Sequence, residues 1–130
     1  MTIQVQSFAN VQQMEVVVNG PGNANRLFII SGTAVFNFTP LGDESQAVDD
    51  LIFAIGPFFQ PGQLINLTAG ASLASISNQG TAIGALWAVD SVNAGLNEAG
   101  RVQVIARLVV RDTDGFINRL GFQVHILAAL

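Results

Sequence analysis

Short runs of apolar residues, separated by turn residues, recur along the whole chain. Val, Ile and Phe dominate these runs, and Gly, Pro, Asn and Ser interrupt them, which is typical of an antiparallel sandwich or barrel. Helical spacing of apolar positions is nearly absent. We therefore expect an all-β fold, an antiparallel β-sandwich with jelly-roll-like connections. The pattern predicts eight or nine strands, at residues 2–8, 12–19, 26–38, 51–56, 63–68, 72–77, 82–92, 101–112 and 116–127.

The segment 26–38 indicates which side of a strand faces the core. Its apolar residues recur at every second position, and a strand directs successive side chains to opposite faces. Gly32 lies within that apolar set and contributes no packing, so it predicts a bulge or a close approach of another backbone segment. The residues expected to face the core are Phe28, Ile30, Ala34, Phe36 and Phe38.

The last two runs, 101–112 and 116–127, predict a hairpin. A two-residue loop would pair core positions with polar ones. A three-residue loop, with Gly115 in the left-handed conformation, aligns the two apolar faces instead. We expect this hairpin to be central in one sheet. Its expected pairs are Leu108 with Leu120, Ala106 with Phe122, Val104 with Val124, and Val102 with Ile126.

The other face of this hairpin would gather four of the five arginines of a chain that has no lysine. Guanidinium groups suit carboxylate, phosphate or sulfate, so the face predicts a site for an anionic small molecule or glycan. The alternative is that the arginines pair with the acidic cluster of the chain, within one copy or across a subunit interface. This cluster consists of Asp43, Glu44, Asp49 and Asp50. The candidate binding residues are Arg101, Gln103, Arg107, Arg111, Arg119, Gln123 and His125.

The acidic cluster lies between the third and fourth predicted strands. Asp43 followed by Gln46 resembles a capping pair and predicts one helical turn there. A second acidic motif, Asp112-x-Asp114-Gly115, resembles the start of a calcium loop but lacks the later oxygen donors that calcium needs. We expect no bound metal. The weak candidates for metal ligands are Asp43, Glu44, Asp49, Asp50, Asp112 and Asp114.

The composition indicates a single folded domain spanning residues 1–130, because 50% of the residues are hydrophobic and only 11% are charged. The chain has no cysteine, which excludes disulfides, thiol nucleophiles and cysteine-ligated zinc. Its one histidine excludes most histidine-based metal sites. The glycines form no phosphate-loop or dinucleotide-binding pattern, so we expect no cofactor.

The net charge of −4 and the pI near 4.5 predict repulsion from nucleic acid and from anionic membrane surfaces. No apolar run approaches the roughly 18 residues of a spanning helix, and the N-terminal residues as given do not form a secretory signal. We expect no nucleic-acid partner and no membrane partner.

The single tryptophan, Trp87, follows Ile83 and Ala85 at a period of two, which predicts a core or interface anchor. The chain has no tyrosine, which counts against a carbohydrate module that stacks sugars on exposed rings.

These patterns favour a non-catalytic, self-associating structural or binding protein that forms a homo-oligomer. Scarce charge, absent lysine, the separation of opposite charges and the apolar C-terminal residues 127–130 all favour contact between copies. One alternative is a binding module for an anionic small molecule or glycan on the arginine face. Another is an enzyme with paired carboxylates, for which the sequence selects no pair among its nine acidic residues.

Overall fold

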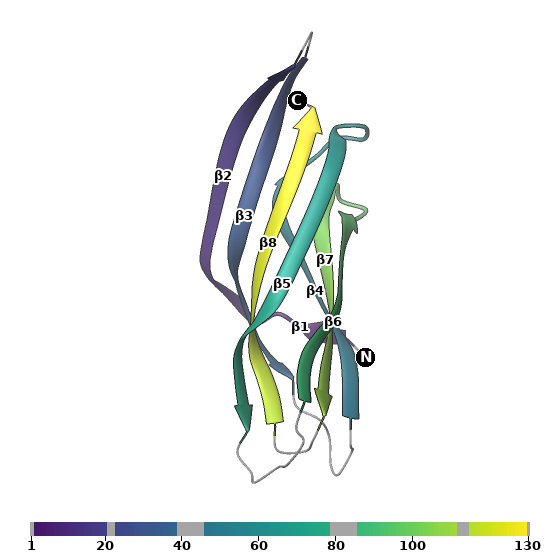
Figure 1. Ribbon diagram of the computed structural model, residues 1–130. Coiled ribbons are helices and arrows are strands. Elements are labelled where there is room, and N and C mark those ends of the chain that lie inside the picture. Colours follow the sequence, from purple (N-terminus) through teal and green to yellow (C-terminus); the bar gives the residue numbers. More distant parts are fainter. Residues whose placement is uncertain (1, 21–22, 39–45, 79–85, 112–114, 130) are drawn as a thin grey trace.

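Eight strands and no helix occur in the parts of the chain that the computed structural model describes, which are residues 2–20, 23–38, 46–78, 86–111 and 115–129. No helix that could cross a membrane is therefore found among these residues. The predicted all-β fold is confirmed. The strands are β1 (Thr2–Gln4), β2 (Ser7–Gly20), β3 (Asn23–Phe38), β4 (Gln46–Phe58), β5 (Leu64–Asn78), β6 (Leu86–Leu96), β7 (Arg101–Arg111) and β8 (Gly115–Ala129) (Figure 1).

The strands form two four-stranded sheets, which lie as two layers (Figure 1). The first sheet has the order β1-β4-β7-β6, and the second sheet has the order β2-β3-β8-β5. Neighbouring strands are antiparallel with one exception, because β1 runs parallel to β4. The expectation of antiparallel pairing is therefore wrong for β1 alone.

The core lies between the sheets and is built from alternate positions of their strands. In β3 the predicted apolar set is buried, whereas the intervening Ser31 and Thr33 are only partly covered. The rings of Phe53 in β4 and Phe122 in β8 lie 4.9 Å apart between centroids and join the two layers. The buried residues of the two central strands are Val102, Val104, Ala106, Leu108 and Val110 in β7, and Leu120, Phe122, Val124, Ile126 and Ala128 in β8.

The predicted hairpin of residues 101–112 and 116–127 is wrong. β7 pairs with β4 and β6, whereas β8 pairs with β3 and β5, so the two strands belong to different sheets. Leu108 and Leu120, expected side by side, are buried in opposite layers, and the other three expected pairs are separated in the same way. The alternation of apolar and polar residues specifies which face of a strand is buried, but it does not specify the partner strand. The same positions are buried whether the two strands form a hairpin or lie in facing sheets. The turn residues 112–114, on which the predicted register relied, lie outside the described residues.

Two local predictions are also corrected. Residues 46–50 belong to β4, so no helical turn forms over them, and Asp43 lies outside the described residues. The segments 63–68 and 72–77, expected as separate strands, form the single strand β5. Main-chain pairing with β8 continues across the small residues between them, because a ladder of backbone hydrogen bonds needs no large side chains.

Gly32 lies opposite a bulge, as predicted, and the groups that approach it closely are side chains rather than another backbone segment. β2 inserts two residues, Asn10 and Val11, where β3 has Gly32 alone, and Asn10 adopts a φ of 55° in the left-handed region. On the inner side, a Cβ on Gly32 would lie 3.0 Å from Cζ of Phe122 and 3.0 Å from Cγ2 of Val11. Gly32 therefore leaves room for the ring of Phe122, its partner in the β3–β8 ladder. The ring covers the backbone of Gly32.

The turn between β6 and β7 is tied to the residue that follows β4. Within the turn, the side-chain oxygen of Asn97 accepts hydrogen bonds from the backbone N–H groups of Ala99 and Arg101, each at 3.0 Å. The N–H of Phe59 donates to the carbonyl oxygen of Gly100 at 2.8 Å. Gly100 has a φ of 84°, and a Cβ there would clash with the carbonyl oxygen of Phe59. This position requires glycine for its φ and for the space.

We expect Gly100→Ala to lower the free energy of unfolding by about 2–4 kcal/mol, because it combines a strained φ with a backbone clash. Gly62→Ala tests the effect of φ alone, because Gly62 also has a φ of 84° but nothing lies within 4 Å of an added Cβ. It should lower the free energy of unfolding by only about 1 kcal/mol. Gly95→Ala, in an open strand position, should change it by less than about 0.5 kcal/mol. Urea unfolding followed by circular dichroism measures the stability of all three variants. Equal losses of stability for Gly100→Ala and Gly62→Ala would refute the predicted backbone clash at Gly100.

Candidate binding surfaces

The structure divides the predicted arginine face between the two sheets. Arg101, Gln103 and Arg107 alternate with the buried positions of β7 and so belong to the outer face of the first sheet. The β8 residues Arg119, Gln123 and His125 belong to the outer face of the second sheet. Arg111 lies in β7, but its side chain is outside the described part of the molecule. Because the inner faces meet at the core, these two outer faces lie on opposite sides of the molecule, and the seven residues do not form one site.

Arg101 stabilises the end of β4. Its Nε donates a hydrogen bond to the carbonyl oxygen of Gly56 at 2.8 Å, and its guanidinium carbon lies 5.6 Å from the centroid of the Phe58 ring. The register between β4 and β7 shifts here, between Ile55 and Phe58, so the arginine spans an irregular part of the ladder. A charge-assisted hydrogen bond and a cation–π contact already engage this side chain.

Arg107 pairs with the acidic cluster, as the alternative interpretation predicts. Its Nε lies 3.6 Å from Oδ1 of Asp50, and the two residues are opposite each other in the β4–β7 ladder. Their side chains are 54% and 38% exposed, so the pair adds about 1 kcal/mol or less. Asp49 lies opposite Leu108, at the next position of the ladder and therefore on the other face of β4.

The metal candidates do not assemble into a site in the described part of the chain. No group of three or more histidine, cysteine, aspartate or glutamate residues there could hold a metal ion. Four of the candidates lie outside the described residues, and these are Asp43, Glu44, Asp112 and Asp114.

Sequence reasoning missed an ion pair between Arg26 of β3 and Glu15 of β2, which the structure joins through Nη1 and Oε1. The register of the β2–β3 hairpin places Glu15 two residues from Val17, the partner of Arg26. The turn sequence at residues 19–22 was the available signal, because a hairpin about that turn brings these two charges to one face.

The edge strand β2 exposes apolar side chains on both of its faces. β2 pairs only with β3 and forms one margin of the second sheet (Figure 1). Val16, Val17 and Val18 are 40%, 56% and 40% exposed, and consecutive strand residues point to opposite faces. Neither sheet therefore covers this part of β2. Val11 and Met14 are also at least half exposed.

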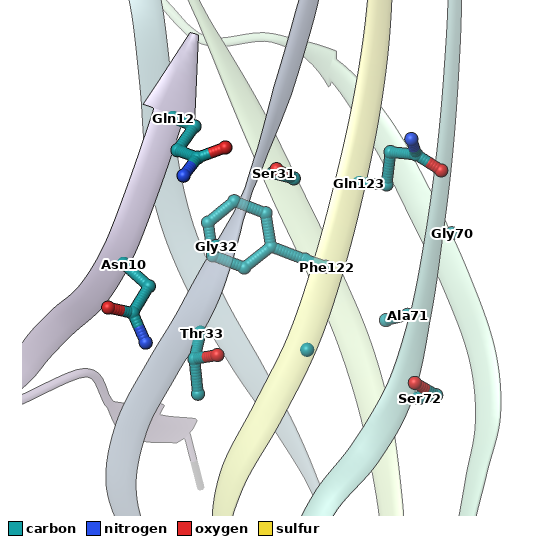
Figure 2. Close-up of a pocket in the computed structure, with 11 residues that line it drawn as sticks. Asn10, Gln12, Ser31, Gly32, Thr33, Gly70, Ala71, Ser72, Phe122 and Gln123 are labelled. Carbon is teal, nitrogen blue, oxygen red and sulfur yellow. The ribbon is translucent and has the colours of Figure 1, made fainter.

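The outer face of the second sheet carries a shallow hollow of about 590 Å³ (Figure 2). Residues of the β2 bulge lie at one margin, and β5 lies at the other. Two rows of aligned residues cross the hollow. They are Gln12, Ser31, Gln123 and Gly70 in one row, and Thr33, Gly121 and Ser72 in the other.

Two smaller hollows involve other predicted residues. Gln103 lines one of about 280 Å³ together with Asn93 on the outer face of the first sheet. His125 and Gln123 line one of about 220 Å³ beside Thr68 on the second sheet. Trp87 lies in β6 opposite Val110, and its side chain is outside the described part of the structure.

Comparison with protein-family models, with curated proteins and with solved structures finds no match to this chain. Three candidate surfaces differ in character: the divided arginine positions, the exposed apolar edge of β2, and the uncharged hollow of the second sheet.

The two arginines of β7 whose contacts are described should differ in their effect on stability. We expect Arg101→Gln to lower the free energy of unfolding by about 1–2 kcal/mol, because it removes the partner of the Gly56 carbonyl. The matched variant Arg107→Gln should lower it by less than about 1 kcal/mol, because it removes only an exposed ion pair. Urea unfolding tests the difference, and a larger loss for Arg107 would contradict it.

Proposed function

We propose that this chain is a non-catalytic, self-associating structural or binding protein, in which the edge of β2 pairs with β2 of a second copy. The observation that supports this proposal is the exposure of apolar side chains on both faces of β2, a strand of 14 residues whose outer edge has no partner strand in the described part of the chain. The proposal includes a β-sandwich architecture, for which jelly-roll-like connections stay a prediction.

Edge strands present unpaired backbone groups, and proteins that remain monomeric protect them with lysine, proline, bulges or short length. β2 is long, and the protein has no lysine at all. Glu15 is the only charged residue of β2, and Arg26 of the same copy pairs with it. The bulge at Asn10 lies toward the start of β2, so it leaves the stretch from Gln12 to Val18 regular.

A second copy could meet this edge in two ways. Pairing of β2 with β2 is isologous and closes as a dimer, whereas pairing of β2 with β5 of the next copy would extend the sheet head to tail. Pairing of β2 with β5 would be antiparallel because strand directions alternate across the second sheet. Pairing of β2 with β2 would be antiparallel because a two-fold axis perpendicular to the sheet reverses the strand direction. We favour the closed dimer because β5 already contacts β6 of the first sheet, while β2 packs chiefly on β3.

The anionic-ligand alternative receives no comparable support. Its arginines lie on opposite outer faces, Arg101 is engaged with Gly56 and Phe58, and Arg107 is paired with Asp50. The apolar C-terminal residues give less support to self-association than the sequence suggested, because Ala128 is buried within its own chain.

Light scattering should show an oligomer whose mass is unchanged between low and high salt, because apolar and main-chain contacts are not screened. Val17→Lys should convert it to monomer by placing a charge at the exposed edge. Asn93→Lys, which adds the same charge to an exposed position of β6, should leave the mass unchanged. Wild-type protein that is monomeric at micromolar concentration would refute self-association.

Cysteine scanning should distinguish the two modes of pairing, because the chain has no cysteine of its own. Single cysteines at each position from 12 to 18 should yield a disulfide-linked dimer at the residue nearest the two-fold axis, where Cα atoms approach within about 7 Å. Asn93→Cys is the matched control and should stay unlinked. If cross-links form only when Met14→Cys protein is mixed with Ile65→Cys protein, the association is head to tail.

A further inference from the structure

The hollow on the outer face of the second sheet has uncharged polar side chains directed into it. Asn10 and Gln12 lie along one margin and Gln123 and Ser72 along the other, with Thr33 between them (Figure 2). None of these five side chains forms a hydrogen bond with another described residue. Their amide and hydroxyl groups are therefore available as both donors and acceptors.

The hollow exists because large side chains are missing from the middle of the sheet. Gly121 of β8 and Gly70 of β5 occupy neighbouring outward positions, so the floor there is backbone. Beneath Gly32 the ring of Phe122 fills the inner side and supports this floor. The hollow is therefore built on a packed core.

The lining specifies the class of ligand. Among the described residues, no arginine, histidine, aspartate or glutamate lines the hollow, so neither an anion nor a cation meets an opposite charge from them. The hollow has a volume of about 590 Å³ and is shallow, so a ligand would lie across the sheet with one side exposed to solvent. Grouped amides and hydroxyls match a ligand that itself carries many hydroxyl groups. We propose that the hollow binds a neutral saccharide, held across the sheet by Gln12 of β2 and Gln123 of β8.

The manner of binding follows from what the hollow lacks. Phe122 is the only aromatic residue among the described residues of the lining and is 4% exposed, so they offer a sugar ring no aromatic face on which to stack. Hydrogen bonds from the amides must therefore provide the affinity, and loss of one amide should weaken binding strongly. This proposal does not require the pairing of β2. The hollow opens on the face of the sheet, with Asn10 and Gln12 of β2 at its margin, whereas a second copy would pair through the backbone groups along the edge.

Isothermal titration calorimetry with cellotetraose, maltotetraose and chitotetraose tests the proposal on the intact protein. We expect at least one of these neutral sugars to bind at millimolar concentration. Gly70→Val should abolish the binding, because an added Cβ at Gly70 meets nothing within 4 Å and the larger side chain then occupies the hollow without disturbing the fold. Gly95→Val is the matched control, an equally open strand glycine of the first sheet, and should bind as the wild type does. Gln123→Ala should weaken binding about tenfold.

Three results would overturn the proposal. The first is no heat from any of the three sugars, and the second is equal weakening by Gly70→Val and Gly95→Val. The third is binding of the acidic trisaccharide of galacturonate in preference to the neutral sugars, which would assign the face to an anion near His125 and Arg119. Light scattering of Gly70→Val separates this proposal from self-association, since loss of the oligomer without any sugar binding would identify the hollow as a subunit contact.

Discussion

The burial of two apolar stripes against each other, one on β7 and one on β8, is the constraint on which the rest of the structure depends. Each strand is one of the two inner strands of its sheet, with a partner on both sides. Every second residue from Val102 to Val110 and from Leu120 to Ala128 is buried. Burial of each valine or leucine side chain contributes about 1.5–3 kcal/mol, so these stripes provide a large part of the driving force for folding.

This packing determines what the outer surfaces can do. Once the inner positions of β7 and β8 face each other, their polar positions must point away from each other. Arg107 consequently meets Asp50 of its own sheet, while Arg119 lies on the far layer. The arginines therefore lie on two separate surfaces. The uncharged hollow forms where Gly70 and Gly121 replace larger outward side chains on the second sheet.

The edge strands of the two sheets differ in length and in how far other strands cover them. β1 is only three residues long, and β5 contacts β6, but β2 extends along a free edge. The exposure of consecutive valines at 16–18 shows that neither layer covers this strand. An edge of this kind is a place where another strand can add by backbone pairing, and the chain carries no lysine to discourage it.

The sequence by itself determined the strand content, the buried face of β3 and the special position of Gly32, because these depend on local alternation and on the absence of a side chain. It also placed the buried residues of β7 and β8 correctly. Only the tertiary structure decided that Leu108 and Leu120 belong to different sheets, because alternation is satisfied equally by neighbours in one sheet and by strands in facing sheets. The position of β2 at an edge, the hollow over Gly121 and the engagement of Arg101 with Gly56 follow from that choice of partners, which involves residues far apart in the chain.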